Sequence, residues 1–185
     1  MSTRRALILA VALTAGAAIA CGPAQAFTLD EVEKEVTADY PSIRHISPEA
    51  LPPSPARGGV LLIDVREEAE FAVSHLPGAL RADPDMDPDE FMRRFGDKVA
   101  GKEVLFYCSV GVRSSDMAQR VGAQLASAGA KVVANLSGGI FRWHNERRML
   151  ISSAGRTDLV HPYNRKWGAL IKRQSQISYT PIPGQ

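Results

Sequence analysis

The residue with the clearest chemical potential is Cys108, which opens a loop that reads Cys-Ser-Val-Gly-Val-Arg-Ser and ends at Ser114. An apolar run at 104–107 directly precedes the cysteine, and a helical pattern at 114–127 follows the loop. Backbone N–H groups converge at such a junction, where they hold an anion and favour the thiolate form of a cysteine. The loop therefore predicts nucleophilic sulfur chemistry at Cys108.

The N-terminal residues 1–26 have the pattern of a signal peptide. Arg4 and Arg5 are followed by an apolar run of 15 residues at 6–20, and then by Ala24-Gln25-Ala26. The apolar run is shorter than the roughly 20 residues that span a bilayer. We therefore expect cleavage after Ala26 and a periplasmic protein. A lipid anchor at Cys21 is the less favoured alternative, because Ala replaces the usual Leu in the preceding box.

Removal of residues 1–26 changes both the charge and the cysteine count. The full chain has 22 basic and 20 acidic residues, and the two basic residues of the leader leave a formal charge of zero. A general nucleic-acid binder is not expected from that balance. Cys108 becomes the lone cysteine, which excludes an intrachain disulfide and leaves either an inert buried thiol or a reactive one.

Strands and helices alternate along the chain. The runs 60–65 and 102–107 are apolar on both faces, as in buried parallel strands. Further strands are predicted at 44–47, 79–80 and 131–136, and helices at 27–40, 66–75, 89–95, 114–127 and 140–148. This pattern predicts an α/β fold with a parallel sheet and helices on both faces.

Three segments are expected to meet at the carboxyl edge of this sheet. Cys108, Asp64-Val65-Arg66 and Ser137-Gly138-Gly139 each follow a predicted strand. In open parallel sheets, ligands bind at that edge. The edge is therefore the expected site.

Four motifs in one order resemble those of a single-domain rhodanese, a sulfurtransferase. They are Ile63-Asp64-Val65-Arg66, Ser74-His75-Leu76-Pro77-Gly78-Ala79, the loop 108–114, and Gly138-Gly139-Ile140-Phe141-Arg142-Trp143. The resemblance covers about 43–150, with Ser74 where the family usually has Gly. It implies a rhodanese-like domain at 44–150, between an N-terminal segment at 27–43 and a C-terminal extension at 151–185.

The resemblance implies that Cys108 accepts a sulfur atom, becomes a persulfide and passes the sulfur on. The expected partners are a small donor such as thiosulfate, a thiol or cyanide acceptor, and alternatively a protein donor or acceptor. No metal or organic cofactor is implied. The residues expected to surround the persulfide are Ser109, Val110, Gly111, Val112, Arg113 and Ser114.

Roles for these loop residues follow from their types. Gly111 tolerates the positive φ that lets the loop curl around the sulfur, with backbone N–H groups of the loop as donors. Arg113 offers a fork suited to an oxyanion, or alternatively a surface ion pair. Ser114 or Ser115 is expected to cap the following helix, and Ser114 is also a candidate donor to the sulfur.

Four residues outside the loop complete the expectations. Asp64 and Arg66 are predicted to form a structural pair at the loop base, with Arg66 alternatively adding positive potential near the sulfur. His75 is expected to hydrogen-bond in a turn, and Trp143 to lie in the core or a pocket wall.

The spacing and residue types of the loop also bear on rival functions. Related cysteine phosphatases have a Cys-x5-Arg loop, whereas Arg113 gives Cys-x4-Arg, which fits a sulfur atom better than a phosphate. Mercaptopyruvate-type enzymes usually show Cys-Gly-x-Gly-Val-Thr, so Ser109 and Arg113 favour thiosulfate. Val110 and Val112 make the loop less cationic than many thiosulfate enzymes, which keeps a persulfide carrier as the alternative. A silent interaction domain is disfavoured by Cys108, Gly111 and Arg113.

The C-terminal extension is expected to pack on the domain through Tyr163, Trp167 and Leu170, or alternatively to dock a partner or anionic lipid.

Overall fold

The computed structural model describes residues 27–181. The predicted signal peptide, its cleavage after Ala26 and the alternative lipid anchor at Cys21 lie outside the described residues. Within the described part, no helix is long and apolar enough to cross a membrane.

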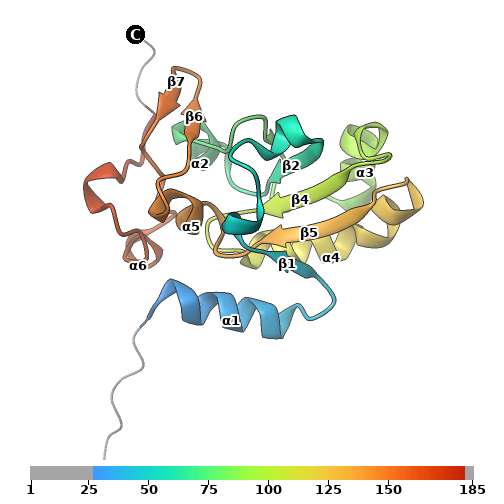
Figure 1. Cartoon of the computed structure of the whole chain (residues 1–185), viewed down its shortest axis with the longest axis horizontal. Coiled ribbons are helices and arrows are strands. Elements are labelled where there is room, and N and C mark those ends of the chain that lie inside the picture. The colour runs from blue at the N-terminus through green and yellow to red at the C-terminus, as the bar shows by residue number, and fades with distance from the viewer. Residues whose placement is uncertain (1–26, 182–185) are drawn as a thin grey trace, which may run out of the picture.

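A five-stranded parallel sheet forms the centre of the protein, as Figure 1 shows. Its order is β1-β5-β4-β2-β3, and every neighbouring pair is parallel. The strands are β1 (Arg44–Ile46), β2 (Val60–Asp64), β3 (Leu80–Arg81), β4 (Glu103–Tyr107) and β5 (Val132–Leu136). The predicted α/β fold with a parallel sheet is confirmed.

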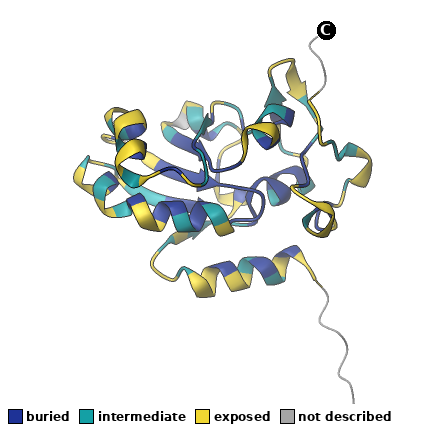
Figure 2. Cartoon of the chain, turned by 180° about the vertical axis from the view of Figure 1, so that it is seen from behind, coloured by how far each residue is buried: buried dark blue, intermediate teal, exposed yellow. Residues whose placement is uncertain are grey.

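Successive side chains of the central strands enter two separate cores. Leu61 and Ile63 of β2 pack toward helices α3 (Pro88–Phe95) and α4 (Val112–Ser127), whereas Leu62 packs toward helix α5 (Gly139–Asn145). This is the alternation that a strand requires when both faces of its sheet are covered. Figure 2 shows the buried strands between helices whose outer faces are exposed. Helices on both faces are therefore confirmed.

The boundaries of helices α2, α4 and α5 differ from those predicted. Helix α2 is Glu68–Val73, so the expected helix at 66–75 is too long at both ends. Arg66 is held by buried hydrogen bonds before the helix begins, and His75 pairs with the strand β6 (Leu150–Ser152) after it ends. The predicted helix at 140–148 ends at Asn145, and the predicted helix at 114–127 begins two residues earlier, at Val112.

The segments on either side of the predicted domain share its core. Helix α1 (Leu29–Asp39) begins with a capping box between Thr28 and Glu31, and it buries three apolar side chains. The extension contains β6, β7 (Gly155–Thr157) and α6 (Arg165–Gly168), with β6 and β7 forming an antiparallel hairpin. The apolar residues that these two segments add to the core beside α5 are Leu29, Val32, Val36, Leu150, Val160, Leu170 and Ile171.

Candidate functional site

Cys108 directly follows β4 and lies just before α4, as the order of elements predicted. Its side chain is 1% exposed, and the backbone N–H of Gly111 lies 3.2 Å from the sulfur and donates to it. Gly111 is the N-cap of α4 with φ +111°, a conformation that few residues other than glycine adopt. The curled loop thus directs a backbone donor and the positive end of a 16-residue helix toward the thiol.

The N-terminus of α5, which follows the neighbouring strand β5, holds the Cys108 loop in place. The N–H groups of Ile140 and Phe141 donate to the carbonyl oxygens of Cys108 and Ser109, at 2.9 and 3.1 Å. Gly139 makes this approach feasible, because a Cβ there would lie 2.4 Å from the Cys108 carbonyl oxygen. The predicted meeting of the segments after β4 and β5 is therefore a backbone contact.

Asp64 and Arg66 form the base of the site from β2. The Arg66 guanidinium donates to both Asp64 carboxylate oxygens, at 2.7 and 2.6 Å, and to the Ser74 carbonyl oxygen at 2.7 Å. Both side chains are 0% exposed. The geometry is that of the expected structural pair, and the carboxylate compensates the charge that Arg66 would otherwise direct toward Cys108.

His75 and Trp143 also have partners of a structural kind. The His75 Nδ1 lies 3.0 Å from the Phe71 carbonyl oxygen, in keeping with a turn hydrogen bond. Trp143 is fully buried in the core beside α5, and its indole N–H donates to the Met149 carbonyl oxygen at 3.0 Å.

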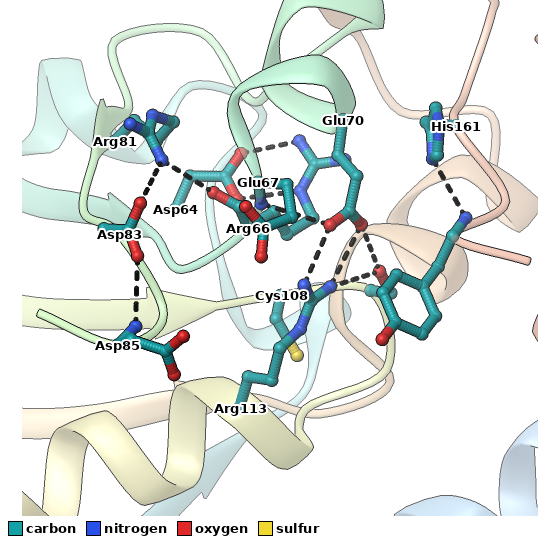
Figure 3. A network of polar contacts seen from close by, with 12 residues as sticks. Asp64, Arg66, Glu67, Glu70, Arg81, Asp83, Asp85, Cys108, Arg113 and His161 are labelled. Carbon is teal, nitrogen blue, oxygen red and sulfur yellow. Dashed lines mark hydrogen bonds and ion pairs between the residues drawn. The ribbon is translucent and has the colours of Figure 1, made fainter. Parts of the chain in front are cut away.

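Arg113 is bound to a carboxylate that the sequence did not single out. Its two terminal nitrogens donate to the two oxygens of Glu70 on α2, at 2.8 and 3.0 Å (Figure 3). The hydroxyl of Ser109 donates to the same carboxylate at 2.9 Å. The sequence left two roles for Arg113, a fork for an oxyanion or a surface ion pair, and the structure shows an ion pair that is partly buried.

The environment keeps this pair ionised. Burial opposes the charged form of Glu70, but hydrogen bonds and the charge of Arg113 outweigh it, so the pKa of Glu70 lies below its usual value. Burial likewise opposes the charge of Arg113, but Glu70 outweighs it and raises the pKa of Arg113. Local sequence indicates only that Glu70 can close a capping box with Glu67, because its partner Arg113 lies 43 positions away.

The two serines of the loop have roles that differ from those expected. Because α4 begins at Val112, Ser114 and Ser115 lie inside the helix and neither caps it. The Ser114 hydroxyl donates to the Asn135 side-chain oxygen at 2.7 Å, and the Ser115 hydroxyl donates to the Gly111 carbonyl oxygen at 2.7 Å. These bonds tie the first turn of α4 to β5 and to the loop.

The extension supplies one wall of the site. A pocket of about 140 Å³ lies over the loop, with Tyr163 and Trp167 beside the loop residues. The Tyr163 ring lies over the Arg113 guanidinium, 4.8 Å from ring centre to carbon. Of the expected packing residues of the extension, Leu170 is buried, while Tyr163 remains 45% exposed above the pocket. The full set of lining residues is Cys108, Ser109, Val110, Val112, Arg113, Tyr163 and Trp167.

This arrangement suits attack by a recessed cysteine sulfur on a small electrophile. The pocket is smaller than the ~300–1,000 Å³ that drug-sized ligands occupy. Backbone donors and a helix N-terminus can stabilise negative charge on the sulfur. The site therefore offers a cysteine sulfur that only a small molecule or a narrow side chain can reach.

Comparisons with known proteins agree with this geometry. A sequence model of the Rhodanese-like domain family matches residues 47–146. The thiosulfate:glutathione sulfurtransferase of Saccharomyces cerevisiae is 38% identical over 71 residues, which are 34% of this chain and 50% of that protein. A tRNA uridine(34) hydroxylase of Bacillus pumilus is 31% identical over 99 residues, which are 52% of this chain and 30% of that protein. The chain thus spans half or less of the length of these relatives.

The fold is also found in a solved structure. The crystal structure of thiosulfate sulfurtransferase from Pseudomonas aeruginosa matches with a TM-score of 0.51 at 18% sequence identity. The match covers 69% of this chain and 23% of that one. At this identity, the likeness concerns the fold alone.

Proposed function

Since the chain belongs to the rhodanese-like domain family, a family of sulfur-transfer proteins, we propose that it moves a sulfane sulfur through a persulfide on Cys108. The observation that carries the proposal is the position of the Cys108 sulfur. It lies at the end of β4, 3.2 Å from the Gly111 N–H that donates to it, at the N-terminus of α4 and under a small pocket. Backbone donors and a helix N-terminus in such a position can stabilise the negative charge of a persulfide.

The reaction has two balanced steps. With thiosulfate as donor, the Cys108 thiolate bonds to the outer sulfur, the sulfur–sulfur bond of thiosulfate breaks, and sulfite leaves with the electron pair. An acceptor thiolate or cyanide then bonds to the outer sulfur of the persulfide and releases the Cys108 thiolate. No external oxidant is required, and Glu70, Arg113 and Ser109 keep the loop in the geometry that both steps use.

A second candidate is a persulfide carrier that receives its sulfur from a partner protein and turns over small donors slowly. Its support is the 1% exposure of Cys108 and the engagement of Arg113 by Glu70. A small anionic donor would find no open guanidinium fork in this arrangement.

Intact mass and thiocyanate formation test the two candidates together. The protein is incubated with thiosulfate, weighed, and then treated with cyanide, and the Cys108→Ser variant is the matched control. A one-sulfur adduct that the variant lacks, with repeated thiocyanate release, supports the enzyme. An adduct that forms only with a persulfidated protein donor supports the carrier. Absence of any adduct contradicts both.

The place of action is a separate part of the proposal. The pattern of residues 1–26 supports export to the periplasm with cleavage after Ala26. Recovery of the protein from a periplasmic extract with Phe27 at its N-terminus would support this. A mass that retains the leader or carries lipid on Cys21 would contradict it.

A further inference from the structure

The charges around Cys108 are already matched within the protein. Arg113 lies against Glu70 and Arg66 lies against Asp64, each with both carboxylate oxygens engaged. Figure 3 shows the Asp64–Arg66 pair above the cysteine and the Arg113 side chain beside it, reaching up to Glu70. Each ion pair contributes no net charge, so the loop offers mainly backbone dipoles to an incoming anion.

The remaining surface of the pocket is apolar. Val110 and Val112 come from the loop, and Tyr163 and Trp167 from the extension. The Tyr163 ring covers one face of the Arg113 guanidinium, yet 45% of the tyrosine is exposed, so a ligand can still contact it. The aromatic wall therefore faces the space that a donor must enter.

The backbone holds Tyr163 in this position at a conformational cost. Tyr163 has φ +63°, in the left-handed region that a bulky residue rarely adopts. Its N–H donates to the His161 Nδ1 at 3.0 Å, which stabilises the turn. Strained residues of this kind concentrate at binding sites.

A doubly charged donor fits this pocket poorly. Transfer of charge into an apolar site is costly unless an opposite charge compensates it. The N-terminus of α4 carries about half a unit of positive charge, which suits one negative charge better than two. A donor in which an apolar group replaces one charged oxygen of thiosulfate would lose one charge and gain contacts with Tyr163 and Trp167.

We propose that this site selects a monoanionic sulfur donor that carries an apolar group beside the transferable sulfur, in preference to the thiosulfate dianion. The proposal rests on the sulfur-transfer function proposed above and names its donor class. For an organic thiosulfonate, the Cys108 thiolate bonds to the outer sulfur, the sulfur–sulfur bond breaks, and the sulfinate leaves with the electron pair. The step balances without an oxidant.

Benzenethiosulfonate and thiosulfate form a matched pair of probes for this test, because both deliver one sulfur atom by the same displacement. Rates of thiocyanate formation with cyanide give kcat/KM for each donor. We expect benzenethiosulfonate to be preferred by roughly tenfold or more, the discrimination that contacts with an apolar group give. Equal values, or a preference for thiosulfate, would overturn the proposal.

Substitutions at Tyr163 and Glu70 test whether the aromatic wall and the neutralised charge of Arg113 cause the preference for benzenethiosulfonate. Tyr163→Ala should reduce the preference, because it should raise KM for benzenethiosulfonate by more than it changes KM for thiosulfate, and Tyr163→Phe should retain the preference. Glu70→Gln removes the negative charge that neutralises Arg113 and should shift the ratio of the two kcat/KM values toward thiosulfate, whatever its effect on the overall rate. If Glu70→Gln does not fold, the Tyr163 pair still decides the result. A preference that Tyr163→Ala leaves intact would contradict the proposal.

The failure of this proposal can be told apart from failure of the proposed function. If neither small donor places sulfur on Cys108, the proposed enzyme function fails together with the donor class, and loading by a persulfidated protein donor then decides whether the carrier function stands. If both donors load Cys108 but thiosulfate is equal or better, the function stands and only the donor class is wrong.

Discussion

Gly139→Ala tests how the contact between α5 and the Cys108 loop sets the geometry of the site. A Cβ at this position would lie 2.4 Å from the Cys108 carbonyl oxygen and 2.7 Å from that of Ser109. Both oxygens belong to the backbone, so neither can rotate away as a side chain would. Ordinary contact begins at 3.4 Å, so the loop must move by about 1 Å. A misplacement of about 1 Å can reduce a reaction rate by ~10²-fold.

The stability effect has two contributions. Gly139 has φ +53°, where a residue with a Cβ costs about 1–2 kcal/mol. Overlap in a packed region adds about 1–3 kcal/mol. Gly101→Ala is the matched control, because Gly101 has φ +73° and nothing lies within 4 Å of its added Cβ. It should show the backbone cost alone.

The assay combines thermal unfolding with the rate of sulfur loading on Cys108. At about 2–4 °C per kcal/mol for a chain of this size, Gly139→Ala should unfold several degrees below Gly101→Ala. Its loading rate should fall by roughly 10²-fold, while that of Gly101→Ala stays near the native value. If the two variants unfold together and both load at the native rate, the α5 contact does not set the loop geometry and the reasoning is refuted.

Two further predictions concern stability. Asp64→Asn should lower the unfolding free energy by about 3–5 kcal/mol in urea denaturation, because it leaves the buried Arg66 charge without its partner. The control Asp97→Asn, at an exposed ion pair, should change the unfolding free energy little. Equal effects of the two substitutions would contradict a structural role for the Asp64–Arg66 pair. Burial lowers the pKa of His161, whose neutral Nδ1 accepts the Tyr163 N–H. Below pH ~6.5 the unfolded state therefore binds a proton first, and stability is lost as the pH falls through the folded pKa. Urea unfolding between about pH 7 and 5 should show a steeper loss for the native protein than for His161→Asn, and parallel slopes would refute the role of this histidine.

Local patterns in the sequence carried most of the architecture. The apolar runs at 60–65 and 102–107 became β2 and β4, because a strand covered on both faces must be apolar on both. Their carboxyl ends then placed Cys108 and Asp64 at one edge of the sheet. Helix ends were less well predicted, since long-range hydrogen bonds of Arg66 and His75 decide where α2 begins and ends.

The candidate site divides along the same line. Cys108 and Gly111 could be recognised because strand, loop and helix follow one another along the chain, and a curled loop of this kind needs a glycine at positive φ. Glu70 could not be recognised, because the sequence shows only its local capping pattern with Glu67, while its partner Arg113 lies 43 positions away. Tyr163 was expected to pack on the domain, and the structure shows that it does so over Arg113, at the pocket.

The sequence by itself thus determined the parallel sheet and the strand ends that meet at one edge, and it predicted Cys108 as the nucleophile, because each of these depends on residues that are neighbours in the chain. The tertiary structure alone decided the character of the pocket. It brought Glu70 to Arg113 across 43 positions, and Tyr163 of the extension over the same guanidinium. Charge compensation and the apolar wall are properties of side chains that meet only after folding, since burial and pairing depend on neighbours in space.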